Sequence, residues 1–477
     1  MWWLLIPIAL ILFLAIVLIR ALMFKPEKCD AINATSVFVN GEKATSDLAE
    51  MIKCKTISHR DKTLDDELEF EKFEKLLPKL FPLVFEKCSY EKIGERGILI
   101  KWRGKSQESP SVFMSHYDVV SVEQADWEKP AFDGIVDNGV LWGRGTLDTK
   151  GTLNGILQAA ETLISEGFVP AHDIYFAFGG NEEVAGDGSW GIVQHFKSLG
   201  VTPGMVLDEG GAVCTGVFPG VKGPIALIGI GEKGQMNIRY TVKGGGGHSS
   251  SPKAGGPIPR LSAACLRVEK SSFKFTLTKP AELLFDTAGR HSAFLYRVLF
   301  ANLWCFAPLL SLYAKLSGGE FNALVRTTIA FTQMTGSKGA NVIPAHATMV
   351  SNHRIIPGET VESVVDRIKK IVNDDKIEVS LIDGNNPSVI SETNCEAYNR
   401  VKSAISETWQ DTIVSPYLMV AASDSRHWGE ISDKVYRFSA MALSKEERGM
   451  IHGNNERIPL DTISRTVEFF IRIMRKS

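Results

Sequence analysis

Short apolar runs alternate with helical patterns along most of this chain, and this alternation constrains the fold more than any other feature. The runs at 112–114, 174–178 and 205–207 are short and β-rich, and a helical pattern at 152–164 separates the first two. Strand, loop and helix repeated in this order predict parallel βαβ units. We therefore expect an α/β protein built on a mixed, mainly parallel sheet.

Histidine and carboxylate residues follow these apolar runs directly. In open α/β sheets the ligand crevice lies outside the carboxyl ends of the strands, so such residues should meet at one edge. His, Asp and Glu without Cys form the ligand chemistry of a catalytic divalent-metal site, and one further carboxylate beside a ligand supplies a general base. Each position alone is weak evidence for a metal site, since adjacent glutamates, for example, usually form a solvated face. Together they are stronger evidence, because each follows an apolar strand and the set supplies enough ligands for two metal ions. The set comprises His116, Asp148, Glu182, Glu183, Asp208 and His452.

With 477 residues the chain is too long for one compact core, so two or more domains are expected. After residue 230 several glycines break the pattern, and strands and an amphipathic helix at 361–372, typical of a smaller α+β unit, follow. The simplest account is an inserted domain within a discontinuous catalytic domain. The predicted boundaries are 1–24 for a signal-anchor or signal segment, 25–44 for a linker, 45–230 for the first catalytic part, 231–384 for the insert and 385–477 for the second catalytic part.

The N-terminus departs from the globular pattern. Residues 2–19 carry no charge and just reach the length of a membrane-spanning helix. A cleaved signal peptide would prefer a charged start and an Ala-x-Ala-like site, so we favour an uncleaved signal-anchor, with secretion after cleavage as the alternative. Arg20, Lys25 and Lys28 predict a cytosolic flank, whereas the glycosylation sequon at Asn33 is useful only in the lumen. We expect the secretory pathway, with a lumenal or extracellular catalytic domain.

The segment 294–316 is rich in Leu, Phe and Trp. Arg297, Asn302 and Pro308 interrupt it, which argues against a second membrane span. One interpretation is a set of packed helices or an oligomer surface. The other is an apolar wall for an acyl chain, or a patch lying on a membrane.

Composition excludes several classes of protein. The chain has 53 basic and 55 acidic residues, which argues against a nucleic-acid partner. Its seven cysteines show no CxxC spacing, so a cysteine metal site and a disulfide scaffold are not expected, although one or two disulfides remain open.

Nine motifs occur in an order that carries a family resemblance. The motifs are Met114-Ser115-His116-Tyr117-Asp118, Gly143-Arg144-Gly145-Thr146-Leu147-Asp148, Asn181-Glu182-Glu183, Leu207-Asp208-Glu209-Gly210, Gly247-His248-Ser249, Asn341-Val342-Ile343-Pro344, Arg354-Ile355, Asp424-Ser425-Arg426 and Ile451-His452-Gly453. With these motifs the chain resembles the zinc aminoacylase and carboxypeptidase S family of co-catalytic metallopeptidases (clan MH), and within it the subgroup of N-fatty-acyl-amino-acid synthase/hydrolases.

The resemblance implies a site with two Zn²⁺ ions. His116 and Asp208 would bind one ion, Glu183 and His452 the other, and Asp148 would bridge both. Asp118 would orient His116, and Glu182 would serve as the general base.

The resemblance also implies that the insert acts as a lid and dimerisation domain. His248 would polarise the scissile carbonyl, with His248 and Asn341 supplied by the partner subunit of a homodimer. Arg354 would clamp a substrate carboxylate bidentately, and Asp424 and Arg426 would line the site or brace a loop. The alternative is that neither residue belongs to the site, with Arg354 an ordinary surface arginine and His248 an ordinary loop histidine.

The leading hypothesis is therefore a di-zinc amidohydrolase that acts on N-acyl amino acids with a free carboxylate. Fatty acyl groups are favoured, and the reaction would also run in reverse when fatty acid and amino acid are abundant. The alternative substrates are dipeptides or short peptides, as for a carboxypeptidase S-like exopeptidase. The rival class is a non-catalytic, membrane-tethered binding protein on the same fold.

Overall fold

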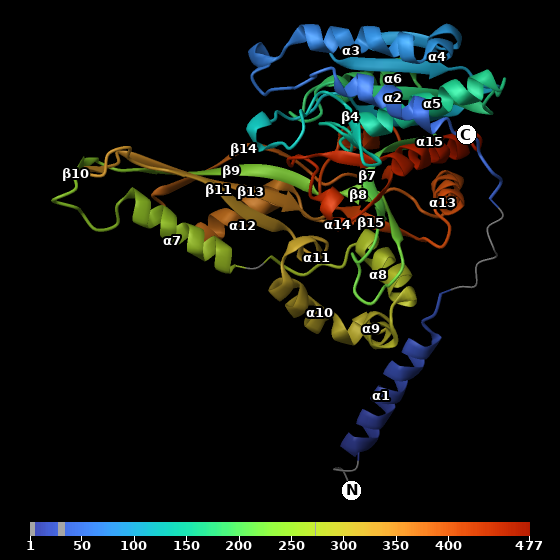
Figure 1. Cartoon of the computed structure of the whole chain (residues 1–477). Coiled ribbons are helices and arrows are strands. Elements are labelled where there is room, and N and C mark those ends of the chain that lie inside the picture. Colours follow the sequence, from blue (N-terminus) through green and yellow to red (C-terminus); the bar gives the residue numbers. More distant parts are fainter. Residues whose placement is uncertain (1–4, 27–33, 272) are drawn as a thin grey trace.

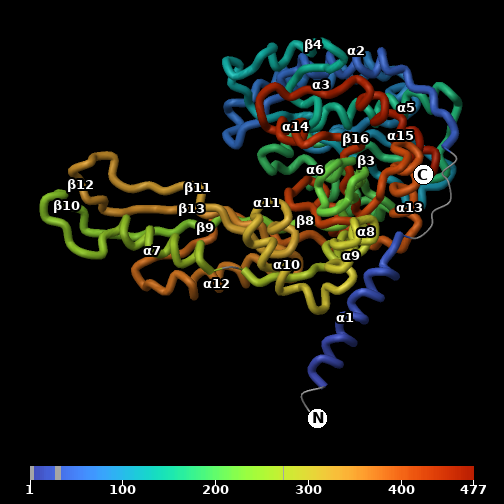
Figure 2. The backbone as a smooth tube through the Cα atoms, turned by 60° about the horizontal axis from the view of Figure 1, so that its bottom comes forward, coloured from blue at the N-terminus to red at the C-terminus, as the bar shows by residue number. Residues whose placement is uncertain are grey.

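A computed structural model describes residues 5–26, 34–271 and 273–477 of the chain. Lys28 and the sequon residue Asn33 lie outside these ranges. Figures 1 and 2 show a large domain, a smaller sheet that extends away from it, and the helix α1 (Leu5–Met23), which projects from the large domain at the N-terminus.

The large domain is organised around an eight-stranded sheet of order β1-β2-β6-β3-β7-β16-β8-β15. Neighbours β6, β3, β7 and β16 run parallel, as do β8 and β15, whereas β1 and β2 are antiparallel additions at one edge. This confirms the predicted mixed, mainly parallel α/β fold. The strands are β1 (Ser89–Ile93), β2 (Gly97–Trp102), β3 (Ser106–His116), β6 (His172–Gly179), β7 (Met205–Cys214), β8 (Ile225–Glu232), β15 (Ile413–Met419) and β16 (Val435–Leu443).

Helices cover both faces of this sheet because its strands are apolar on both sides. One face packs against buried side chains of α2, α3, α5, α13 and α15, and the other packs against α6 and the short helix η4. A small sheet of β4 (Ile135–Asp137), β5 (Val140–Trp142) and β17 (Arg457–Pro459) lies beside the loop that carries Asp148. The helices are α2 (Gly41–Ile52), α3 (Glu67–Leu80), α4 (Pro82–Lys87), α5 (Lys150–Ser165), α6 (Gly188–Leu199), α13 (Glu396–Thr408), η4 (Asp424–Glu430), α14 (Lys445–Arg448) and α15 (Leu460–Met474).

The smaller sheet has the order β11-β13-β9-β14, and all four strands are antiparallel to their neighbours. Helices α7 and α12 pack on it through a separate apolar core, and the β10–β12 pair lies at its far tip (Figure 1). The elements are β9 (Gly234–Lys243), β10 (Gly247–His248), α7 (Pro257–Lys270), β11 (Thr328–Thr335), β12 (Val342–Ile343), β13 (His346–Ile355), α12 (Val361–Val372) and β14 (Ile377–Asn385).

Four helices inside the predicted insert do not belong to the smaller sheet. Helices α8 (Lys279–His291), α9 (Phe294–Phe300), α10 (Leu303–Ser317) and α11 (Gly319–Ala323) share an apolar cluster with β8 and β15, at the edge of the large sheet. The segment 294–316 is thus a pair of packed helices, and α9 and α10 meet at 106°.

Within the described residues, α1 is the one helix long and apolar enough by itself to cross a membrane, and the bent α9–α10 pair passes the same test when taken together. The cysteines of the described residues are free, so no disulfide forms among them.

Candidate active site

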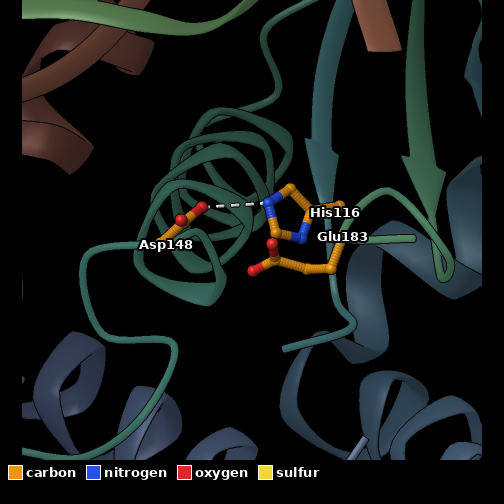
Figure 3. Close-up of side chains that lie close together, drawn as sticks. All are labelled: His116, Asp148 and Glu183. Atoms are coloured by element: carbon orange, nitrogen blue, oxygen red, sulfur yellow. Dashed lines mark hydrogen bonds and ion pairs between the residues drawn. The ribbon is translucent and has the colours of Figure 1, made fainter. Parts of the chain in front are cut away.

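Asp148 lies between two imidazole rings. His116 is the last residue of β3, and its Nε2 atom is 3.0 Å from Asp148 Oδ1 (Figure 3). The other carboxylate oxygen, Oδ2, is 3.0 Å from Nε2 of His452, which lies between α14 and β17. Residues from distant parts of the sequence therefore meet at the carboxyl edge of the sheet, as parallel strands require.

Glu183 completes one side of this group. It follows β6, and its Oε2 atom is 2.9 Å from His452 Nε2. Its other oxygen, Oε1, is buried and has no hydrogen-bond partner among the described residues. A buried carboxylate oxygen without a partner is costly, and a bound cation would satisfy it.

Asp118 holds both His116 and the glutamate loop in place. His116 Nδ1 is 3.0 Å from the backbone carbonyl oxygen of Asp118. The fully buried Asp118 carboxylate accepts hydrogen bonds from the backbone N–H groups of Glu182 and Glu183, each at 3.1 Å, and from Ser58 Oγ at 2.6 Å. Such contacts fix the orientation of a ligating histidine.

The structure places Glu209, and not Asp208, at the position predicted for the remaining ligand. Glu209 Oε1 is 3.5 Å from His116 Nε2 and lines the cavity. Asp208 is buried on the other side of β7, where its carboxylate accepts a hydrogen bond from the Ser425 N–H at 3.0 Å. Adjacent residues in a strand point to opposite faces, so only one of this pair can face the site.

Two overlapping donor groups result. One consists of His116, Asp148 and Glu183, the other of His116, Glu182 and Glu209, and in each the donor atoms lie within 4.8 Å of one another. These donors fit divalent metal ions, because nitrogen and carboxylate oxygen atoms converge from several strands.

The electrostatics of the group also favour cations. Burial raises the pKa of Glu182 well above its ordinary value, and the charges of Asp424 and Glu209 add to this effect while His116 opposes it. Burial, with the charge of Asp148, raises the pKa of Glu209 to about 8. The raised pKa values mean that burial and mutual repulsion disfavour the ionised carboxylates, and divalent ions bound between them would stabilise the ionised forms.

Glu456 is a functional residue that the sequence analysis missed. Its fully buried carboxylate accepts hydrogen bonds from Arg144 Nη1 at 2.6 Å and from the backbone N–H groups of Gly145, Leu147 and Asp148 at 3.0, 2.7 and 3.2 Å. It thereby holds the loop that carries Asp148. A lone glutamate after the turn Gly453-Asn454-Asn455 has no pattern that distinguishes it from a surface residue.

Not all of the predicted substrate-binding residues come together. Arg354, near the end of β13, and Arg426 line the same cavity as Asp148 and His452. Asp424 is buried and lies close to the end of β6. A Cβ atom placed on Gly179, the last residue of that strand, would be 3.1 Å from Asp424 Oδ2. His248 and Asn341 are exposed at the far tip of the smaller sheet and do not reach this cavity (Figure 1).

The cavity has a volume of about 680 Å³ and two chemically different ends. The polar end contains the donor groups described above. The other end is mainly apolar and is lined by Phe218, Leu284, Phe321 and Leu324 of one apolar cluster, with the Glu320–Arg448 ion pair also in the lining. A cavity of this size that combines an apolar wall with a few convergent polar groups is typical of a small-molecule site.

Paired histidine and carboxylate donors at the carboxyl edge of a mixed α/β sheet, with a further buried glutamate beside them, define a metal-dependent hydrolase. Residues 112–476 match peptidase family M20/M25/M40, and the chain belongs to this family.

The chain is similar to named members of this family over most of their length. The chain is 34% identical to the probable carboxypeptidase S-like 2 of Dictyostelium discoideum over 438 residues, which cover 90% of this chain and 84% of that protein. It is 33% identical to the N-fatty-acyl-amino acid synthase/hydrolase PM20D1 of Xenopus tropicalis over 482 residues, with 98% and 94% covered. The fold is similar to that of the M20 family metallo-carboxypeptidase Sso-CP2 from Sulfolobus solfataricus, with a TM-score of 0.67, 16% identity, and coverage of 91% of this chain and 98% of that one.

Proposed function

We propose that this chain is a di-zinc amidohydrolase that cleaves the amide bond of N-fatty-acyl amino acids with a free carboxylate. One observation carries the proposal: a single cavity joins the metal-donor groups to an apolar wall, and its lining includes Arg354 from β13 of the smaller sheet. The names of the relatives support the same substrate class, since one of them is an N-fatty-acyl-amino acid synthase/hydrolase.

In this proposal Asp148 would hold both metal ions, because its two oxygens face different histidines. His116 and Glu209 would complete one site, and Glu183 and His452 the other. When bound, a pair of divalent ions would polarise the scissile carbonyl group and acidify the attacking water. The nitrogen and oxygen donors suit zinc, and we propose zinc as the resident metal.

Glu182 is proposed as the general base. Its carboxylate lies within the His116–Glu209 group and lines the cavity, while its backbone N–H is fixed by Asp118. A base in this position takes a proton from water and delivers it to the leaving nitrogen. Burial raises the pKa of Glu182, which favours the protonated form that the second step needs.

The carboxylate of the substrate would bind Arg354, whose guanidinium group is half-buried in the cavity wall. Arginine binds a carboxylate bidentately, so it would fix the amino acid half of the substrate. Arg426 and the buried Asp424 would line the same half. The acyl chain would then lie along the apolar wall at the other end of the cavity.

The exposed positions of His248 and Asn341 suit a homodimer, in which each would reach the active site of the partner subunit. The β10–β12 pair that carries His248 projects away from its own large domain, as such an exchange requires (Figure 1). We therefore propose that the smaller sheet with α7 and α12, the part of residues 231–384 outside α8–α11, forms a lid and dimerisation insert between the catalytic parts 45–230 and 385–477.

We further propose that α1 is a retained signal-anchor and that the chain enters the secretory pathway, with its catalytic domain lumenal or extracellular. The helix has the length and composition of a membrane span.

A carboxypeptidase S-like activity on dipeptides is the second candidate, because the relative from Dictyostelium discoideum carries that name. The two candidates differ at the apolar end of the cavity, which a dipeptide would leave largely unfilled.

A hydrolysis panel on the zinc-loaded protein tests the proposal. The substrates are a palmitoyl amino acid, its methyl ester, an acetyl amino acid and a dipeptide. We expect the palmitoyl amino acid to be cleaved fastest and its methyl ester poorly. Glu182→Gln should lower kcat by roughly 10²–10⁴-fold while zinc binding is retained. If the zinc-bound wild type and the zinc-bound Glu182→Gln variant both show equal, negligible hydrolysis, the chain is a non-catalytic binding protein. If the wild type cleaves the dipeptide fastest, the chain is an exopeptidase.

A further inference from the structure

Specific polar contacts join α1 to the helices α9 and α10. The Arg20 side chain donates hydrogen bonds to Ala301 O at 3.0 Å and to Asn302 Oδ1 at 3.1 Å, and the fully buried Asn302 donates from Nδ2 to the backbone oxygen of Val17 at 3.0 Å. The rings of Phe13 and Trp304 meet edge to face at 5.9 Å. The apolar helix is thus docked on the folded domain and is not merely tethered to it.

These contacts fix the depth of α9 and α10 relative to α1. A helix of 19 residues is about 28 Å long, which matches the hydrocarbon core of a bilayer. The contact positions 13, 17 and 20 lie roughly 4–15 Å along the helix axis from Met23, its C-terminal end. If α1 spans a bilayer, α9 and α10 therefore lie at the depth of helices embedded in one leaflet, about 5–10 Å below its surface.

The side chains of α9 and α10 suit that position. Leu310 and Ala314 on α10 pack inward on the large domain, yet most outward side chains are apolar too, including Leu295 and Leu316, both 78% exposed, with Lys315 and Ser317 as exposed polar exceptions near the end of α10. Residues 294–317 contain no acidic residue. A helix with apolar residues on its outer as well as its inner face is favoured where protein or lipid covers both, and no protein covers the outer face within the described chain.

The same region borders the apolar end of the active-site cavity. Helices α8 and α11 flank α9 and α10 in the sequence, and the cavity-lining residues Leu284 and Phe321 belong to them. Leu324 follows α11 directly and lines the cavity as well.

We propose that α1, α9 and α10 form one membrane-embedded unit that seats the large domain on a lipid bilayer, with the apolar end of the cavity beside the membrane. The occupant of the exposed α9–α10 face is the acyl region of one leaflet. The second part of the proposal, that acyl substrates enter from the bilayer, rests on the proposed function.

Brominated phospholipids test the first part, because they quench tryptophan fluorescence only in contact with the acyl region. The full-length protein, Trp304→Phe and the control Trp190→Phe are each reconstituted into vesicles of phosphatidylcholine with or without brominated chains. Trp190 lies on α6, away from α1, and is also exposed. The emission that Trp304→Phe removes should be largely quenched by brominated lipid, and the emission that Trp190→Phe removes should not. Equal, weak quenching of both overturns the proposal.

Kinetics test the second part. The variant Leu312→Glu/Leu316→Glu places carboxylates on the outer face of α10, and Leu199→Glu on α6 is the matched exposed control. We expect the double variant to hydrolyse a palmitoyl amino acid presented in vesicles about tenfold more slowly than the wild type, with little change on a soluble acetyl amino acid. Equal rates on the vesicle substrate contradict entry from the bilayer. If the wild type hydrolyses none of these substrates, the proposed function is refuted. The quenching experiment then still decides whether α1, α9 and α10 form a membrane-embedded unit.

A second copy of the chain is the other conceivable occupant of this face. If the double variant lowers the oligomer mass in detergent while Trp304 escapes quenching, the face is a dimer interface and the membrane proposal is wrong.

Discussion

Replacing Glu456 with glutamine tests whether one buried carboxylate holds the loop that carries Asp148. Glutamine preserves the shape of the side chain but presents an acceptor oxygen at one end only. At the nitrogen end two donors lose their acceptor, either Arg144 and Gly145 or Leu147 and Asp148. Arg144 itself is buried and would keep its charge.

The expected magnitude follows from these contacts. Hydrogen bonds to a charged group contribute about 1.5–3 kcal/mol each, and loss of one partner of a buried ion pair costs about 3–5 kcal/mol. We therefore expect Glu456→Gln to lower the free energy of unfolding by about 3–5 kcal/mol. Because Asp148 loses its support, zinc affinity should fall by roughly 10–100-fold, as for other residues that orient a ligand.

Two assays separate these effects. Thermal unfolding of the metal-free protein measures the loss of stability, and calorimetric titration with zinc measures affinity. The control is Glu446→Gln, since Glu446 forms an exposed ion pair with Arg457 at 3.0 Å and should change neither quantity appreciably. If Glu456→Gln matched that control in both assays, the proposed role of Glu456 would be refuted.

Three further predictions concern the metal, the substrate carboxylate and the smaller sheet. Chelation should abolish hydrolysis and lower the Tm, and added zinc should restore both, whereas activity that survives complete chelation would contradict a metal-dependent reaction. Arg354→Lys should raise KM for a palmitoyl amino acid by roughly tenfold and leave KM for its methyl ester unchanged, and an equal effect on both would exclude a carboxylate clamp. Burial lowers the pKa of His353 to about 4 from an ordinary value of 6.5, so the folded state disfavours the protonated ring. The free energy of unfolding should therefore fall by roughly 3 kcal/mol as the pH drops from about 6.5 to 4. His353→Gln should flatten this dependence in thermal unfolding measured across that range, and an unchanged slope would assign the acid sensitivity to other groups.

The parallel strands were predictable because each is a short apolar run that ends in a polar residue. The helix α12 spans residues 361–372 as its apolar spacing predicted, and β3 ends at His116. Periodicity and strand ends are local properties, so the sequence reveals them directly.

The choice between Asp208 and Glu209 could not be made in the same way. Both residues follow the same apolar run, and a shift of one residue along a strand reverses the face on which a side chain lies. Only the pairing of β7 with its neighbours and the contact of Asp208 with the Ser425 N–H decide which carboxylate faces the cavity.

The packing of α8–α11 on the large domain could not be predicted from the sequence either. These helices lie between strands of the smaller sheet in the chain, so their spacing suggested that they belong to the insert. Their apolar side chains instead meet β8 and β15, and such long-range contacts leave no periodic signal in the sequence.

The chain-length preference of the enzyme tests the central claim most directly, namely that one cavity joins a metal site to an acyl-binding wall. The measurement is the ratio of kcat/KM for a palmitoyl amino acid to that for its acetyl analogue. Leu324→Ala shortens a side chain of the apolar wall, and Val325→Ala removes methyl groups from the same cluster at a buried position outside the cavity.

Burial of a leucine side chain contributes about 1.5–3 kcal/mol, so a contact that is partly lost should lower the ratio by roughly tenfold in Leu324→Ala. Val325→Ala should leave the ratio within about twofold of the wild-type value, because it changes stability without touching the acyl chain. A wild-type ratio near one, or equal ratios in the wild type and Leu324→Ala, would contradict the acyl-binding wall.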